Sequence, residues 1–274
     1  MRIEWSRMGV FASVPLVTVA ASLVAIHVLN RFAPYLPNWV KRVVHWIHTI
    51  TCELLAFVAV IVLLPLSCRE RRRVNPGGGR PLLLVHGYFH DCSGWVYLRR
   101  CLAAAGLGPI YVLHLGHPMR SIHEHAETLG ACARRIEQET GRKDLALVGH
   151  SMGGLVAWEY ATKLAPPDTV TDIVTLGSPL AGTRVAHLGI GQSARDMEPG
   201  SLFIQELQRN IAAAPHIRSY QIGVRVDHLV IPYGSAFIGR GPARQLLIED
   251  LGHLGLLFSS RVARQVAAWL QTER

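Results

Sequence analysis

Ser151 stands at the centre of a Gly-His-Ser-Met-Gly pentapeptide, between the apolar run 145–148 and a second apolar stretch, 155–164. The first run predicts a buried strand and the second predicts a helix. A serine between a strand and a helix, flanked by glycines that allow close backbone packing, is typical of a nucleophile elbow. In such a turn the hydroxyl points out of the sheet, so the pattern predicts that Ser151 is a nucleophile. The structural alternative is an ordinary turn serine.

A hydroxyl is a weak nucleophile at neutral pH, so Ser151 requires a base and an acid that orients the base. His253 lies in a glycine-flanked loop ahead of a C-terminal helical stretch, where an imidazole can take the serine proton and return it. Asp227 follows an alternating run, 217–226, that predicts a strand, and a carboxylate at a strand end can fix the imidazole tautomer. Asp250 is a rival for the acid, but it lies close before His253 rather than at the end of an earlier strand.

Acyl transfer also requires donors for the developing oxyanion. The N–H of the residue after the nucleophile, Met152, is one candidate. The buried-strand pattern 81–85 ends in His86-Gly87-Tyr88, so the N–H of Tyr88 is the second, with Gly87 allowing the close approach. We expect His86 to hold this loop through hydrogen bonds rather than to enter the chemistry.

Four segments together resemble the bacterial lipases of the α/β-hydrolase superfamily. They are VHGY at 85–88, VGHSMGG at 148–154, VTLGSP at 174–179 and GHLGLL at 252–257. The last segment, continuing through 258–260, is particularly similar to the small Bacillus lipase A group. The resemblance covers about residues 80–273 and leaves the first eighty residues without a counterpart.

The resemblance implies a catalytic triad of Ser151, Asp227 and His253, in the chain order of the α/β-hydrolases. It implies an oxyanion hole formed by Tyr88 and Met152. The alternation of apolar runs agrees with a minimal α/β-hydrolase fold, a mostly parallel sheet with helices on both faces. We expect strands near 82–86, 109–115, 144–149, 170–176, 217–225 and 244–249, and helices near 94–105, 121–140, 153–164 and 258–271.

Residues 182–215 exceed what the smallest relatives need and lie where related lipases place a cap or lid. Their apolar spacing fits one face of a short helix, with Leu202, Phe203, Ile204, Leu207 and Ile211. A mobile lid and a plain packed cap both remain open. No acidic cluster with calcium-ligand spacing stands in the sequence, so we predict no metal and no cofactor.

Composition indicates an added membrane segment. The chain of 274 residues is 50% hydrophobic and only 17% charged, and its mean hydropathy of +0.24 exceeds that of an ordinary soluble domain. Residues 8–30 carry no Lys, Arg, Asp or Glu and are long enough to cross a bilayer core of about 30 Å. Residues 47–68 form a second apolar stretch with one acid, Glu53, closed by the basic run 69–73. We therefore predict a transmembrane helical hairpin within residues 1–68, retained rather than cleaved as a signal peptide.

Residues 69–80 predict a basic, glycine-rich linker to a hydrolase domain at 81–274. The connector 31–48 has aromatic and basic residues that suit a membrane interface, or else it is a short amphipathic connector on the surface. The heaviest basic flank follows the second helix, which favours both termini on the cytoplasmic side of a bacterial inner membrane. A periplasmic or external hydrolase domain stays open for the case in which only one of the stretches spans.

The formal net charge of +9 does not indicate nucleic-acid binding, because the basic residues are scattered or clustered beside the apolar segment rather than interleaved with aromatics. Attraction to anionic lipid headgroups is the simpler account. The five cysteines contain no C-x-x-C pair, and the odd count favours reduced thiols, although one disulfide among Cys92, Cys101 and Cys132 stays open. His123 and His125 do not share a helix face, which argues against a metal site there.

The sequence therefore predicts a membrane-anchored serine esterase or lipase that acts on lipid or small acyl esters through an acyl-enzyme. An acyltransferase or thioesterase stays open, because a triad and an oxyanion hole do not select the leaving group or the acceptor. A further alternative is a non-catalytic membrane adaptor on the same fold, although such a protein has little need for a complete triad.

Overall fold

The apolar runs of the sequence form a six-stranded sheet in the computed structural model, which describes residues 37–66, 74, 79–239 and 244–271. Every pair of neighbouring strands is parallel, and the strand order is β2-β1-β3-β4-β5-β6. The strands are β1 (Leu82–Val85), β2 (Ile110–Leu113), β3 (Leu145–His150), β4 (Val170–Leu176), β5 (Arg218–Val224) and β6 (Arg244–Ile248). All six predicted strands are confirmed.

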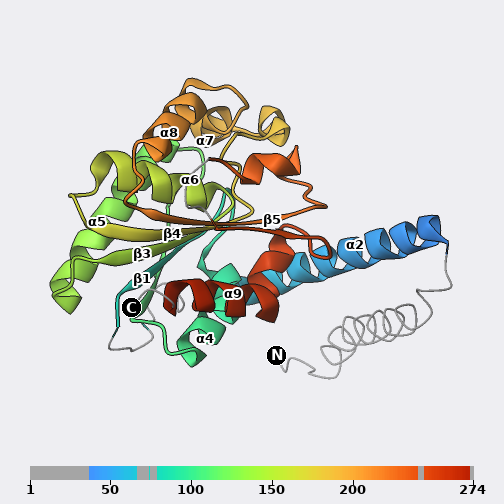
Figure 1. Cartoon of the computed structure of the whole chain (residues 1–274), viewed down its shortest axis with the longest axis horizontal. Coiled ribbons are helices and arrows are strands. Elements are labelled where there is room, and N and C mark those ends of the chain that lie inside the picture. Colours follow the sequence, from blue (N-terminus) through green and yellow to red (C-terminus); the bar gives the residue numbers. More distant parts are fainter. Residues whose placement is uncertain (1–36, 67–73, 75–78, 240–243, 272–274) are drawn as a thin grey trace, which may run out of the picture.

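Helices cover both faces of this sheet, which is why its central strands are continuous apolar runs rather than alternating ones. Figure 1 shows α5 (Ile122–Thr140) and α6 (Met152–Glu159) above the sheet and α4 (Val96–Ala104) and α9 (Ser260–Gln271) below it. A hydrophobic core lies on each face of the sheet, and successive residues of β1 point into different cores. Leu83 packs in the core beneath α5 and α6, and Leu84 packs in the core beneath α4 and α9.

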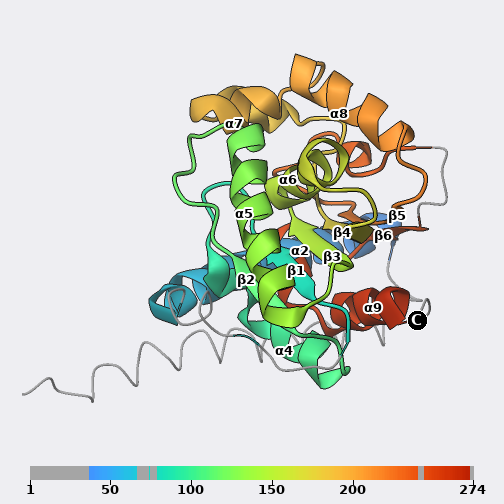
Figure 2. The same cartoon turned by 90° about the vertical axis from the view of Figure 1, so that its left-hand side faces the viewer.

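The segment 182–215, which is predicted to be a cap or lid and is called the cap below, lies over α5 and α6 (Figure 2). It consists of a 3-10 helix (Arg184–Leu188), α7 (Gly191–Asp196) and α8 (Leu202–Ala212). Ile204 and Leu207 are buried on the predicted apolar face of α8. Leu202 differs from the prediction: as the first residue of the helix it points away from this face and is 84% exposed.

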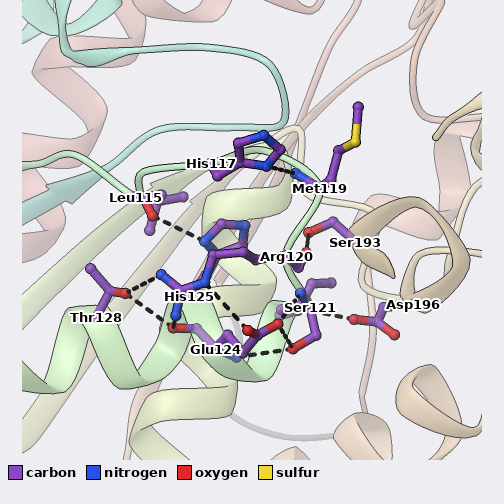
Figure 3. Close-up of polar contacts among 11 residues, drawn as sticks. Leu115, His117, Met119, Arg120, Ser121, Glu124, His125, Thr128, Ser193 and Asp196 are labelled. Atoms are coloured by element: carbon purple, nitrogen blue, oxygen red, sulfur yellow. Dashed lines mark hydrogen bonds and ion pairs between the residues drawn. The ribbon is translucent and has the colours of Figure 1, made fainter. Parts of the chain in front are cut away.

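The cap is tied to the N-terminus of α5 by hydrogen bonds that Figure 3 shows. The Asp196 carboxylate accepts the N–H of Ile122 at 2.9 Å, and the Ser193 hydroxyl donates to the carbonyl of Arg120 at 2.5 Å. The first turn of α5 also has a capping box, in which Ser121 and Glu124 each bond the other's backbone N–H. The free N–H groups at this end of the helix therefore bind both the N-cap residue, Ser121, and Asp196 of the inserted segment.

An apolar helix, α2 (Asn38–Leu63), precedes the sheet and ends in a 3-10 turn (Leu64–Leu66). Among the described residues it is the one helix long and apolar enough to cross a membrane, over Trp46–Leu63, with mean hydropathy 2.1. It begins earlier than the predicted span and includes residues 38–48 of the predicted connector. No proline or glycine interrupts the chain between Pro37 and Pro65, so one helix forms. The other predicted membrane helix, 8–30, lies outside the described residues, as do residues 69–73 and 75–78 of the predicted linker.

The cysteines of the 79–239 segment form no disulfide with one another. Cys92 is buried, while Cys101 and Cys132 are partly buried on helices α4 and α5. The pairing that the sequence left open is therefore not made in this structure.

Candidate active site

Ser151 occupies the turn between β3, which ends at His150, and α6, which begins at Met152. Its backbone has φ 56° and ψ −128°, a conformation that a residue with a side chain adopts only under strain. The flanking glycines make the turn possible. A Cβ on Gly149 would lie 2.4 Å from the Gly154 nitrogen, and one on Gly153 would lie 2.2 Å from the Val85 carbonyl oxygen. The strand, strained serine and helix match the nucleophile elbow predicted from the sequence.

Asp227 and His253 meet where β5 and β6 end. The Asp227 carboxylate oxygen Oδ2 lies 3.0 Å from Nδ1 of the His253 imidazole. Both side chains are buried, with 1% of each exposed. The other oxygen, Oδ1, accepts the N–H groups of Leu229 and Val230, each at 2.8 Å. These two backbone hydrogen bonds fix the orientation of the Asp227 carboxylate toward the imidazole. Asp250 points elsewhere and pairs with Arg261 on the surface.

The charge state of His253 is set by opposing influences. Burial lowers its pKa, but the charge of Asp227, the hydrogen bond to Asp227 and the charge of Glu53 raise it, and the net pKa lies above 6.5. With Nδ1 on Asp227, the other ring nitrogen, Nε2, is buried and has no hydrogen-bond partner within the described part of the chain. Nε2 is thus the nitrogen available to exchange a proton. The structure joins Asp227 to His253, whereas the bond from Ser151 to His253 is not formed among the described residues.

Ser151 and His253 converge at the end of β4. The Ser151 N–H donates to the Leu176 carbonyl at 2.9 Å, and a Cβ on the next residue, Gly177, would lie 3.1 Å from Nδ1 of His253. Gly177 has φ 55°, which favours glycine. The nucleophile turn and the histidine loop are therefore packed on the same short segment.

The two candidate oxyanion donors each adjoin Ser151 or a residue that packs on it. Met152 is the first residue of α6, so its N–H has no acceptor inside the helix. Gly87 packs so closely on Ser151 that a Cβ there would lie 2.8 Å from Ser151 Cβ and 3.3 Å from Oγ. Tyr88 follows directly and brings its backbone to the same place. Its hydroxyl donates to the Ile190 carbonyl at 2.5 Å and accepts the Ile190 N–H at 3.0 Å, which links this loop to the cap.

His86 holds the loop, as expected. Its Nδ1 donates to the Gly87 carbonyl at 3.0 Å and its Nε2 accepts the Leu115 N–H at 3.1 Å. Burial lowers the pKa of His86 to about 3, so the ring is neutral and each nitrogen keeps one role. The imidazole therefore joins β1 to the segment after β2.

Two further residues contact the site, although no role was predicted for them. His150, the second residue of the pentapeptide, donates from Nε2 to the carbonyl oxygen of His253 at 3.1 Å. Burial lowers its pKa well below the ordinary range, and the nearby rings of His253 and His90 act in the same direction. Glu53 of α2 contacts the loop after His253, where it accepts the N–H of Leu254 at 2.8 Å. Its only signal in the sequence is that of a single acid inside an apolar stretch.

The described segments contain no group of three His, Cys, Asp or Glu side chains that could hold a metal ion. The His123 and His125 side chains bond different partners, as expected for two residues that do not share a helix face. His123 bonds the Glu159 carboxylate at 2.8 Å, and His125 bonds the Leu115 carbonyl at 3.2 Å.

Comparisons with known proteins identify the family and the fold. The alpha/beta hydrolase family matches residues 82–272, which contain the sheet and every residue predicted for the site. The dihydrolipoyllysine-residue acetyltransferase component of the acetoin cleaving system from Cupriavidus necator is 32% identical over 141 residues, 48% of this chain and 36% of that protein. The match therefore spans about a third of that relative's length.

Among solved structures, mature Bacillus licheniformis lipase BlEst2 has a TM-score of 0.61 at 17% identity, covering 73% of this chain and 96% of its own. Aspergillus fumigatus lipase B has a TM-score of 0.61 at 18% identity, covering 69% of this chain and 52% of its own. Paleococcus ferrophilus monoacylglycerol lipase has a TM-score of 0.53 at 17% identity, covering 72% and 97%. At such identities the likeness establishes a common fold. Because the family match covers more than half of the sequence, this chain belongs to the alpha/beta hydrolase family.

Proposed function

We propose that this chain is a membrane-anchored serine hydrolase that cleaves carboxylic esters through an acyl-enzyme. The observation that carries the proposal is the buried contact between Asp227 and His253, at the same edge of the sheet as the strained turn of Ser151. Membership in the alpha/beta hydrolase family supports the hydrolase class. A non-catalytic adaptor gains nothing from a strained serine beside a buried acid and imidazole.

In the proposed mechanism Ser151 Oγ attacks the ester carbonyl carbon while Nε2 of His253 takes the hydroxyl proton. Asp227 keeps the proton of the imidazole on Nδ1 and stabilises the imidazolium. The N–H groups of Tyr88 and Met152 stabilise the oxyanion. His253 then gives its proton to the leaving alcohol, which departs and leaves the acyl group on Ser151. A water molecule, deprotonated by His253, releases the acid and restores the serine.

The membrane part of the proposal rests on the surface of α2. Within the span Trp46–Leu63 only 17% of the residues are buried by the protein. The exposed apolar side chains of this helix include Trp46, Ile47, Leu54, Phe57, Val58, Ile61 and Val62. Such a continuous apolar surface has no favourable place in water and suits the acyl region of a bilayer. Lipid-like esters are therefore the substrates that this placement favours.

The similar solved structures named as lipases support ester hydrolysis, and one relative supports a second candidate. The acetyltransferase component from Cupriavidus necator shares 32% identity over 141 residues with this chain. An acyl-enzyme on Ser151 can pass its acyl group to an alcohol, an amine or a thiol in place of water. Product analysis with a competing alcohol separates the two: free acid indicates hydrolysis, whereas a new ester indicates transfer.

The nucleophile assignment is tested by labelling the membrane fraction with a fluorophosphonate probe and then measuring turnover of esters of increasing chain length. Ser151→Ala should lose both the label and the turnover. Ser178→Ala is a matched control, because its buried hydroxyl lies near the elbow and has no hydrogen-bond partner in the described structure. Turnover retained by Ser151→Ala would refute the proposal.

Membrane attachment through α2 is tested by placing charge on its exposed face. The double variant Leu54→Lys and Phe57→Lys should increase the share of protein that carbonate extracts, although the other predicted span, 8–30, is left intact. Leu202→Lys, on the exposed cap, should leave the distribution unchanged. A reporter fused to the C-terminus tests the cytoplasmic placement of the hydrolase domain, since an external signal contradicts it.

A further inference from the structure

One stripe of the apolar helix α2 packs against the hydrolase domain. Thr49, Ala56 and Val60 are buried, and Glu53 lies on the same stripe, because positions four, three and four apart share a helix face. This stripe contacts the 3-10 helix Leu254–Phe258 that directly follows His253. In Figure 1 the blue helix α2 meets the domain beside the red C-terminal segment and projects away from it. The helix is therefore in contact with the proposed active site.

The contact consists of hydrogen bonds to the start of that 3-10 helix. Glu53 Oε1 accepts the Leu254 N–H at 2.8 Å, and Oε2 accepts the N–H groups of Leu254 at 3.1 Å and Gly255 at 3.2 Å. His253 is the cap residue of this helix, and its own side chain makes no capping bond. A carboxylate at a helix N-terminus satisfies backbone donors that would otherwise lack a partner. Glu53 thus makes, from a distant part of the chain, the N-capping hydrogen bonds that the His253 side chain does not make.

The backbone before His253 is shaped around the same carboxylate. A Cβ on Gly252 would lie 2.2 Å from Glu53 Oε2 and 2.7 Å from its carboxyl carbon. Any larger residue at this position would displace Glu53 or the loop. The residues on both sides of His253 are therefore fitted to one side chain of α2.

We propose that Glu53 is a positioning residue that holds the backbone of His253 in its catalytic placement, so that α2 is a working part of the active site rather than only an anchor. The inference rests on the proposed role of His253. Three contacts then fix this residue: Asp227 on Nδ1, His150 on the carbonyl oxygen at 3.1 Å, and Glu53 on the N–H groups that follow. Nε2 is left for the serine proton.

The presence of a carboxylate on this helix supports a functional reading. An acid within an apolar helix is costly to bury or to place near lipid, and it persists where hydrogen bonds or function compensate for that cost. A purely structural contact between α2 and the domain could be made by apolar side chains, as it is at Ala56 and Val60. Glu53 instead places a negative charge near His253, and this charge contributes to raising the pKa of the imidazole.

The test is Glu53→Gln in the full chain, in membranes or detergent. The amide keeps the side-chain length and one acceptor oxygen but removes the charge. We expect kcat to fall between about 10-fold and 100-fold, as for a misplaced catalytic group, with KM little changed. The midpoint of the rise of kcat/KM with pH should move to lower pH, because a charge that favours the imidazolium is gone. Asp250→Asn, which removes a nearby surface carboxylate paired with Arg261, should change neither quantity.

A purely structural role gives a different result. In that case Glu53→Gln lowers the thermal midpoint but leaves kcat and the pH profile unchanged, and the inference is overturned. If Glu53→Gln does not fold, Gly252→Ala keeps the charge and displaces the carboxylate, and it should lower kcat in the same way. An unaltered kcat in a folded Gly252→Ala protein also overturns the inference. Retained turnover by Ser151→Ala, in contrast, would refute the proposed function itself, so the two failures are distinguishable.

Discussion

The Asp227 carboxylate lies 3.0 Å from Nδ1 of His253 and is itself held by two backbone N–H groups. Asp227→Asn keeps the shape of this side chain but presents an amide that favours the wrong imidazole tautomer. We expect kcat to fall by about 10²–10⁴-fold with little change in KM. The control is Asp250→Asn, which alters an exposed pair with Arg261 and should keep wild-type kcat. Loss of activity in Asp250→Asn alone would reverse the assignment of the acid.

The pH dependence of the reaction follows from the charge of His253, which must be neutral to act as a base. Burial lowers its pKa, but Asp227 and Glu53 raise it by more, so kcat/KM should rise with pH around a midpoint above the ordinary histidine value of about 6.5. Fluorophosphonate labelling rates measured from pH 5 to pH 9 report this midpoint. A midpoint clearly below 6.5 would contradict a raised pKa for His253.

The same raised pKa predicts a contribution to stability. A group whose pKa is higher in the folded state binds its proton more tightly there, so the protonated form favours folding. The contribution of His253 is therefore fully present below its unfolded pKa and is lost as pH rises through the folded pKa. Asp227→Asn should flatten this part of a plot of thermal midpoint against pH.

Much of the fold and of the site could be predicted because the signals are local. The strands are continuous apolar runs, and Ser151 lies in a pentapeptide whose glycines are needed for its strained turn. Asp227 could be chosen over Asp250 because an acid at a strand end can reach a later loop. Glu53 could not be assigned a partner, since its hydrogen bond to Leu254 joins residues 201 positions apart. No spacing rule connects an apolar helix to a loop at that separation.

Gly87→Ala is expected to damage the oxyanion hole. The added Cβ would lie 2.8 Å from Ser151 Cβ and 3.2 Å from the His150 carbonyl oxygen, so the loop that brings Tyr88 to the site must shift. Loss of one oxyanion donor costs about 10²–10³-fold in kcat, and we expect a fall of this order in ester turnover.

Gly234→Ala is the matched control for this change, because a Cβ at Gly234 meets no atom within 4 Å. It should leave kcat and the thermal midpoint unchanged. Wild-type kcat in Gly87→Ala would show that Tyr88 does not supply a donor.

Asp196 joins the cap to α5, where its carboxylate accepts the Ile122 N–H at 2.9 Å and the side-chain amide of Gln192 at 2.8 Å (Figure 3 shows the first contact). Asp196→Ala removes both acceptors at a helix N-terminus and should lower the free energy of unfolding by about 0.5–2 kcal/mol. Asp196→Asn retains an acceptor oxygen and should lose less, as measured by urea unfolding. Because Asp196 bonds Ile122 and Gln192 rather than Ser151, Asp227 or His253, we expect kcat for a small soluble ester to be unchanged in both variants. A change of KM for long-chain esters in Asp196→Ala, with the wild-type KM in Asp196→Asn, would show that the cap takes part in holding the substrate. A wild-type KM in both variants would contradict that role.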